Sequence, residues 1–229
     1  MSPVNLPAPV PDVPEAFTET VLEAFAARTG PRFTLVLSGG PTAQACYEVL
    51  HRATTIAWPL VDVYMGDERV VAPDDVDANQ HLVRQALLDG LPVGSFTPMP
   101  TTLPVEECVA EYQRIIAGVL AGPGIDLIHL GVGPDGHTAS LFPHAPTLEA
   151  GPDELVAATT DPNGVNPHPR LTLTLPVINA ARCAVFTVAG DSKRDAVAAL
   201  RKGDDIPAAR VQAARIVWLV DQAASAPPD

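Results

Sequence analysis

The sequence is poor in basic residues and in cysteine. Lysine and arginine total 14 against 27 acidic residues, so the formal net charge is −13. A chain this acidic repels nucleic acid and anionic lipid, and we expect neither as a partner. The three cysteines, Cys46, Cys108 and Cys183, are far apart and form no Cys-x-x-Cys pair. Their spacing predicts free thiols in a reducing, cytoplasmic setting and no metal site.

Long apolar segments are also missing. None approaches the roughly 20 residues that a membrane-spanning helix needs, so we expect no membrane partner. The N-terminal residues MSPVNLPAPVPDVPEA have no basic stretch followed by an apolar one, which argues against a secretion signal. Hydrophobic residues nevertheless make up 47% of the 229 positions. This content favours one folded domain over residues 1–229, with the proline-rich segments 1–14 and 223–229 expected to be loose.

Short apolar strands alternate with helical patterns along most of the chain. Strands are predicted at 33–37, 61–65, 125–132, 183–189 and 215–220, with weaker candidates at 155–159 and 171–175. Helices are predicted at 15–28, from Pro41 to about 51, and at 78–88, 104–120 and 192–201. The alternation predicts an α/β fold, with a mostly parallel, doubly wound (Rossmann-like) sheet covered by helices on both faces. Ligands of such sheets bind beyond the carboxyl ends of the strands.

A glycine-rich segment, Ser38-Gly39-Gly40-Pro41-Thr42, joins the first strand to its helix. Paired glycines allow a tight turn that presents backbone N–H groups, and the helix adds its positive end. Pro41 suits the first helical turn, where its missing N–H costs little. The segment is a candidate phosphate site, although an ordinary turn would have the same composition, and the Walker A pattern is absent.

Charged residues follow the second strand in Gly66-Asp67-Glu68-Arg69. The planar guanidinium of Arg69 could bind an oxyanion or a phosphate, and Asp67 could orient it or take part in acid–base chemistry. Two further cations stand near strand ends. Arg170 precedes the candidate strand at 171–175, and Lys193 stands at a helix start, where a cation opposes the helix dipole unless an anion binds there. Each could instead be an ordinary surface charge.

The stretch GVGPDGHTASLFPH, residues 131–144, follows the third strong strand. Its three glycines match the spacing of the dinucleotide-binding fingerprint, but its two prolines argue against the long helix that this fingerprint requires. His137 is the one histidine flanked by glycine and small hydroxyl residues, which favours a catalytic loop with His137 as general base. Asp135 is close enough in sequence to influence its orientation. Ser140 is a weaker candidate nucleophile, because no G-x-S-x-G motif is present.

Five motifs in order resemble the 6-phosphogluconolactonase family and cover nearly the whole chain. They are LVLSGGPTA, GDERVV followed by Ala78-Asn79, LGVGPDGHTASLFP, PRLTLT with LPVINAA, and Val-x-Gly-x-x-Lys at 188–193. The resemblance implies the fold of the sugar-phosphate isomerases and deaminases. It also implies hydrolysis of 6-phospho-D-glucono-1,5-lactone to 6-phospho-D-gluconate in the oxidative pentose phosphate pathway, without a metal or organic cofactor. We expect a monomer or weak dimer.

The same resemblance assigns roles to individual residues. His137 would activate water, and Asp135 would position His137. Arg69 would lie near the reacting or the phosphate end of the substrate. The resemblance places Gly39, Gly40, Thr42, Arg170 and Lys193 in the phosphate pocket, and Ser38 and Asp67 are further substrate-binding candidates.

The chain departs from the family pattern in the glycine loop. Pro41 stands where serine is usual, which removes a hydroxyl and an N–H that Thr42 or Ser38 could replace. Ala43 stands in place of proline, and Ala78 stands where serine is common.

Two other functions stay open. Amino-sugar-phosphate deaminases and isomerases resemble this chain but carry a glutamate five residues after the histidine. Here that position is Phe142, which cannot exchange protons. A non-catalytic sugar-phosphate sensor would need a DNA-binding module, and the length and charge leave no room for one.

Overall fold

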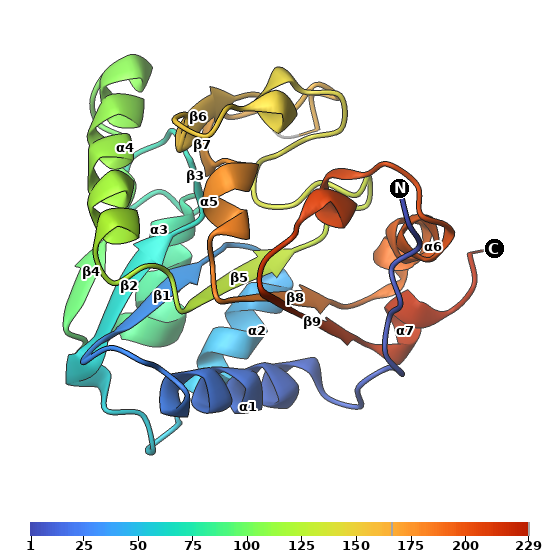
Figure 1. The fold of residues 1–229 in the computed structure, drawn as a ribbon, viewed down its shortest axis with the longest axis horizontal. Coiled ribbons are helices and arrows are strands. Elements are labelled where there is room, and N and C mark those ends of the chain that lie inside the picture. Colours follow the sequence, from blue (N-terminus) through green and yellow to red (C-terminus); the bar gives the residue numbers. More distant parts are fainter. Residues whose placement is uncertain (166, 229) are drawn as a thin grey trace.

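The computed structural model describes residues 1–165 and 167–228 (Figure 1). Six parallel strands form its main sheet, and every pairing in it is parallel. In spatial order the strands are β4 (Ser95–Thr97), β2 (Val61–Met65), β1 (Phe33–Leu37), β5 (Leu127–Gly131), β8 (Cys183–Val188) and β9 (Arg215–Val220). The five strongly predicted strands are all present, and the mostly parallel sheet is confirmed.

Helices cover both faces of this sheet (Figure 1). α1 and α2 lie on one face, and α4 and α5 lie on the other. All residues of β1 and β8 are buried, as expected for apolar strands that have helices above and below. The helices are α1 (Val13–Ala26), α2 (Pro41–Leu50), α3 (Asn79–Val83), α4 (Val105–Ala121), α5 (Leu175–Asn179), α6 (Arg194–Lys202) and α7 (Gln222–Ser225).

Two predicted helices are less regular than their patterns suggest. The helix predicted at 78–88 begins as α3 and continues as a π-helical turn over Arg84–Leu88. The helix predicted at 192–201 begins with a 3₁₀ turn, Asp191–Lys193, before α6. Within the described residues, no helix is long and apolar enough to cross a membrane.

A second, antiparallel sheet stands above the main one and consists of β3 (Asp67–Arg69), β7 (Arg170–Leu173) and β6 (Val156–Thr159). The weaker predicted strands therefore exist, but they lie outside the parallel sheet. No strand was predicted for the charged segment after β2, yet it forms β3, because β7 supplies a hydrogen-bonding partner along its length.

The proline-rich segments make more contacts than a loose tail would. The backbone N–H of Val4 donates to the carbonyl of Leu200 in α6, and that of Val10 donates to the carbonyl of Val220 in β9. At the other end, residues 222–225 form α7, capped by the Asp221 side chain. The N-terminal segment runs beside α6 and α7 (Figure 1).

The strand order positions a binding crevice. The chain leaves β1 toward β2 and β4 on one side, and later fills β5, β8 and β9 on the other. The segments that follow β1 and β5 therefore diverge at the point where the order reverses, which is where open α/β sheets bind ligands.

Candidate active site

The unusual residues of the sequence meet in one pocket of about 170 Å³ at the carboxyl ends of β1, β5 and β8. Of the ten residues expected at a site, nine line it: Ser38, Gly39, Gly40, Thr42, Asp67, Arg69, His137, Arg170 and Lys193. The tenth, Asp135, contacts His137.

His137 and Asp135 form a hydrogen-bonded pair. Nδ1 of His137 lies 2.6 Å from Oδ1 of Asp135, and the backbone N–H of His137 donates to the same oxygen at 3.1 Å. Burial raises the pKa of Asp135, but the hydrogen bonds and charge of His137 outweigh it, so the pKa lies below its usual value. Because an ionised carboxylate only accepts hydrogen bonds, Nδ1 carries a proton, and the lone pair of the neutral imidazole is then on Nε2. A histidine in this state can act as a general base.

Backbone hydrogen bonds hold the loop that carries His137. The N–H of Gly133 donates to the carbonyl of His137 at 2.8 Å, and the N–H of Gly136 donates to the carbonyl of Gly133 at 3.0 Å. Gly136 has a φ of 84°, and a Cβ there would lie 2.7 Å from the Cβ of Ile206. The N–H of Ala208 also donates to the carbonyl of Gly136 at 3.1 Å. The loop is therefore supported from outside by the segment 204–211.

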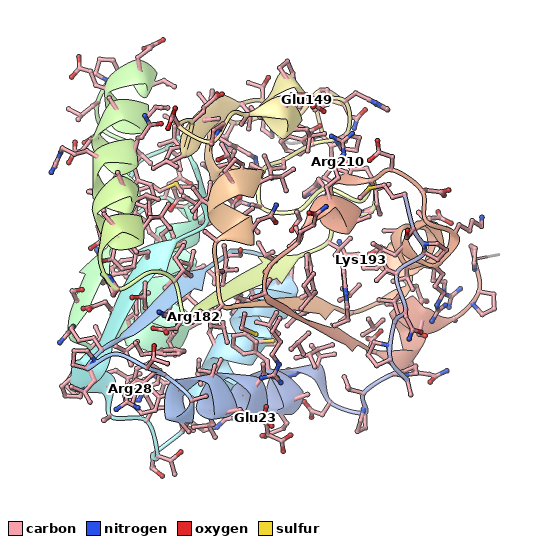
Figure 2. The ribbon with its side chains drawn as sticks, viewed as in Figure 1. Glu23, Arg28, Glu149, Arg182, Lys193 and Arg210 are labelled. Carbon is pink, nitrogen blue, oxygen red and sulfur yellow. The ribbon has the colours of Figure 1, made fainter. Side chains whose placement is uncertain are left out.

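Arg210 anchors that supporting segment. Its guanidinium forms an ion pair with Asp205 at 2.7 Å and a second one with Glu149, which is distant in sequence, also at 2.7 Å (Figure 2). Hydrogen bonds to the two carboxylates raise the pKa of Arg210, which keeps its charge at all relevant pH values. Ion pairs at a surface contribute at most about 1 kcal/mol each, so this group orients the segment more than it stabilises the fold.

Arg69 and Arg170 face each other across the β3–β7 pair, directly opposite in register. Like charges so placed repel. Burial lowers the pKa of Arg170, and the charge of Arg69 lowers it further, although Asp67 opposes both effects. The Nε atoms of both arginines are buried without a hydrogen-bond partner among the described residues. An anion bound in the pocket would relieve the repulsion between the two guanidinium groups.

Asp67 pairs with Arg170 and not with Arg69. Its Oδ2 accepts a hydrogen bond from the Ser140 hydroxyl at 2.7 Å and lies 3.7 Å from Nη1 of Arg170. Arg69 donates instead to the backbone carbonyl of Asp77. Ser140, the weaker candidate nucleophile, is fully buried, and its hydroxyl donates a hydrogen bond to Asp67.

The glycine loop brings the start of α2 to the pocket. Gly40 is the N-cap of α2 with a φ of 103°, and Pro41 occupies the first helical turn. The N–H groups of Thr42 and Ala43 fall in that first turn, where a helix offers donors to an anion. Ser38 lines the pocket, but its hydroxyl donates to the carbonyl of His129 at 2.7 Å.

The sequence assigned no role to Asn79, which lines the pocket, or to Glu68, which holds the start of α3. The fully buried carboxylate of Glu68 accepts from the backbone N–H groups of Asn79, Gln80 and Arg69 at 2.6, 2.7 and 2.8 Å. It thereby caps α3. Nδ2 of Asn79 donates to the carbonyl of Asp67 at 3.0 Å. Its amide fills the space beside Gly39, where a Cβ would lie 1.8 Å from Oδ1 of Asn79.

Lys193 reaches the pocket from the 3₁₀ turn before α6. Figure 2 shows it on the side of α6 that faces the middle of the molecule. Burial lowers the pKa of Lys193, while the nearby carboxylate of Asp135 opposes this effect. The pocket thus holds three cations, Arg69, Arg170 and Lys193. In the part of the chain that the structure describes, no cluster of three or more His, Cys, Asp or Glu side chains could hold a metal ion.

Most of the chain is similar in sequence to known proteins. Residues 10–218 match the family model described as glucosamine-6-phosphate isomerases/6-phosphogluconolactonase. A 6-phosphogluconolactonase of Synechocystis is 42% identical over 204 residues, covering 83% of this chain and 82% of that protein. The human 6-phosphogluconolactonase is 36% identical, covering 85% and 80%.

Solved structures agree. The 6-phosphogluconolactonase of Thermotoga maritima superposes with a TM-score of 0.78 at 30% identity, over 90% of this chain and 96% of that one. A monomeric glucosamine-6-phosphate deaminase has the same TM-score of 0.78 at 17% identity, over 93% and 94% of the two chains, and shares the fold.

Proposed function

The chain belongs to the family of glucosamine-6-phosphate isomerases and 6-phosphogluconolactonases, and we propose that it hydrolyses 6-phospho-D-glucono-1,5-lactone to 6-phospho-D-gluconate. The Synechocystis and human relatives, 42% and 36% identical to this chain, are named for this activity, which supports the proposal. The observation that carries it is the His137–Asp135 pair beside a pocket with three cations. This combination suits a substrate that is both an anion and a hydrolysable ester.

The phosphate of the substrate would occupy the cationic part of the pocket. Backbone N–H groups of the glycine loop and of the first turn of α2 would bind its oxygens, together with the charges of Arg170 and Lys193. The charge of Arg69, directly opposite Arg170, adds to the same positive field. A local cluster of this kind can hold a phosphate despite the overall charge of −13 because it is close and partly shielded from solvent.

Water would attack the lactone carbonyl carbon. Nε2 of His137 takes a proton from the water as the C–O bond forms, and the ionised Asp135 stabilises the imidazolium through Nδ1–H. The positive field of the pocket's cations would stabilise the charge that develops on the tetrahedral oxyanion. When it collapses, the ring C–O bond breaks and the protonated His137 returns the proton to the leaving ring oxygen. The steps use only water and side chains of this protein.

The environment of Phe142 favours hydrolysis over deamination. Phe142 is fully buried, with its ring centroid 5.0 Å from that of His137, and the guanidinium carbon of Arg170 lies 5.9 Å from the Phe142 centroid. An apolar ring here offers no proton to an amino-sugar substrate. It also reduces solvent access to the imidazole, which strengthens the electrostatic interaction with Asp135.

A rate assay on two substrates tests the proposal. The lactone is generated in situ by enzymatic oxidation of glucose 6-phosphate, and its loss is followed against spontaneous hydrolysis. We expect strong acceleration by the purified protein and no release of ammonia from glucosamine 6-phosphate. Efficient ammonia release without lactone hydrolysis would assign the chain to the deaminase branch. Binding of 6-phosphogluconate with neither activity would indicate a sensor.

A further inference from the structure

A buried histidine lies beneath the glycine loop and takes no part in the proposed proton transfer. His129 is in the middle of β5 and is fully buried, with its ring 4.3 Å from that of Phe17 between centroids. Its Nδ1 lies 2.8 Å from the hydroxyl of Tyr47, and its Nε2 lies 2.8 Å from Oγ1 of Thr187. Both ring nitrogens are therefore hydrogen bonded.

The Tyr47 hydroxyl holds the first residue of the glycine loop at two points. It accepts a hydrogen bond from the backbone N–H of Ser38 at 3.0 Å and lies 2.8 Å from the backbone carbonyl oxygen of Ser38. The hydroxyl of Ser38 in turn donates to the backbone carbonyl of His129 at 2.7 Å. Ser38 is thus attached to Tyr47 and His129 through all of its polar atoms.

The protons of this network can be assigned by counting. A phenol has one proton, and the carbonyl of Ser38 can only accept it, so the Tyr47 hydroxyl donates to Ser38. The hydroxyl must then accept from His129, which places the imidazole proton on Nδ1. Nε2 is left as an acceptor, and Thr187 donates its proton to it. The other tautomer would place the Tyr47 and Ser38 oxygens 2.8 Å apart with no proton between them.

Burial keeps this arrangement in one protonation state. It lowers the pKa of His129 to about 3, because a charged imidazole would lose its hydration inside the sheet. His129 is therefore neutral where an enzyme works, and it cannot exchange protons with the substrate at neutral pH. Its two ends nevertheless reach the pocket, through Ser38 on one side and Thr187 on the other.

We propose that His129 is a positioning residue, whose Nδ1–H tautomer orders the Tyr47 hydroxyl and so fixes the Ser38–Gly40 loop in its ligand-binding conformation. This inference rests on the proposed function, because it assigns the loop to substrate binding. An apolar residue at position 129 would leave the buried hydroxyls of Tyr47 and Thr187 with fewer partners. The hydrogen bonds that hold the loop, with its N–H groups directed at the ligand, would then no longer be fixed in one arrangement.

Three variants separate this role from a merely structural one. His129→Leu removes both ring nitrogens, His129→Asn keeps an N–H donor at the place of Nδ1, and Tyr47→Phe removes the hydroxyl. We expect His129→Leu and Tyr47→Phe to raise KM for the lactone about tenfold with little change in kcat, since the loop would bind substrate and transition state alike. His129→Asn should restore most of the affinity. The double variant Tyr47→Phe/His129→Leu should have a KM for the lactone no higher than that of either single variant.

Ile128→Ala is the matched control. Ile128 is fully buried in the same strand, and its side chain points to the opposite face of the sheet from that of His129. We expect it to lower Tm without raising KM. Unchanged KM in Tyr47→Phe and in His129→Leu would overturn the proposal, as would a rise in KM for Ile128→Ala equal to theirs.

The tautomer is measured independently of activity. In ¹⁵N NMR of the wild-type protein, we expect His129 to show a protonated Nδ1, an unprotonated Nε2 and no titration between pH 5 and pH 8. A protonated Nε2 would contradict the proposal even if all variants fail to fold. If the wild-type protein binds no 6-phosphogluconate and hydrolyses no lactone, the proposed function fails, while the NMR result still decides the tautomer.

Discussion

Gly133 lies so close to His137 that a Cβ at position 133 would sit 2.1 Å from Nδ1 of His137 and 2.7 Å from Oδ1 of Asp135. The absence of a side chain at Gly133 is what lets the histidine and the carboxylate meet. The glycine spacing that resembles a nucleotide-binding fingerprint therefore has a different physical cause: it clears space for an acid–base pair.

Gly133→Ala should separate that pair. We expect kcat for lactone hydrolysis to fall about 100-fold, because a displacement of roughly 1 Å at a catalytic group can cost this much. Gly151→Ala is the control, since a Cβ at Gly151 would have nothing within 4 Å. Steady-state kinetics on both variants checks the prediction. Equal kcat values for the two variants would mean that catalysis does not depend on the space that Gly133 leaves beside His137.

The main sheet and the composition of the pocket could be predicted from the sequence for a simple reason. Parallel strands buried on both faces are continuous apolar runs, and their carboxyl ends converge, so polar residues after each run meet. Two strands of the second sheet, β6 and β7, were weakly predicted, but their pairing with β3 into a separate sheet could not be. β3 has three residues, all charged, and becomes a strand only because β7 pairs with it. Because the pairing strand is distant in sequence, the residues of β3 show no local pattern that would predict a strand.

Residues that support the site were missed for a related reason. Thr187 and His129 lie inside apolar strand patterns, where a polar residue signals only a satisfied core position. Glu68 alternates with Asp67 and Arg69 along β3, so it faces away from them and caps α3. The Ala78-Asn79 motif was the one available signal for Asn79.

Lys193 should bind substrate through its charge. We expect Lys193→Met to raise KM about tenfold or more with a smaller effect on kcat. Because burial lowers the pKa of Lys193, KM of the wild-type protein should rise with pH before an ordinary lysine would deprotonate. Lys193→Arg should move that rise to higher pH.

The chain offers a matched control, because it contains one other lysine. Lys202 is exposed at the end of α6, and Lys202→Met should leave KM unchanged. If the two methionine variants have equal KM values, the charge of Lys193 is not used in binding.

Glu68 should make stability depend on pH. Burial raises its pKa to about 7, although three backbone N–H groups oppose the shift. The folded state then holds a proton that the unfolded state releases near pH 4.5. The free energy of unfolding should therefore decrease as pH rises from about 4.5 to 7, by up to about 3 kcal/mol. Urea unfolding of Glu68→Gln should lack this decrease, and a slope equal to that of wild type would show that another group is responsible.

Ser140→Ala distinguishes direct hydrolysis from a covalent mechanism. Since the buried hydroxyl donates to Asp67, its removal should cost about 1–2 kcal/mol of stability and reduce kcat less than tenfold. A nucleophilic serine would instead lose activity by about 1,000-fold or more. Kinetics at a temperature well below Tm keeps the two effects apart.

The most direct test of the account is the kcat of His137→Ala for lactone hydrolysis, with 6-phosphogluconate affinity measured on the same sample by calorimetry. The exposed His144, outside the pocket, provides the control variant His144→Ala. We predict that His137→Ala lowers kcat about 1,000-fold while product affinity changes little, because the phosphate contacts are intact. A His137→Ala variant that hydrolyses the lactone at the wild-type rate would contradict the account.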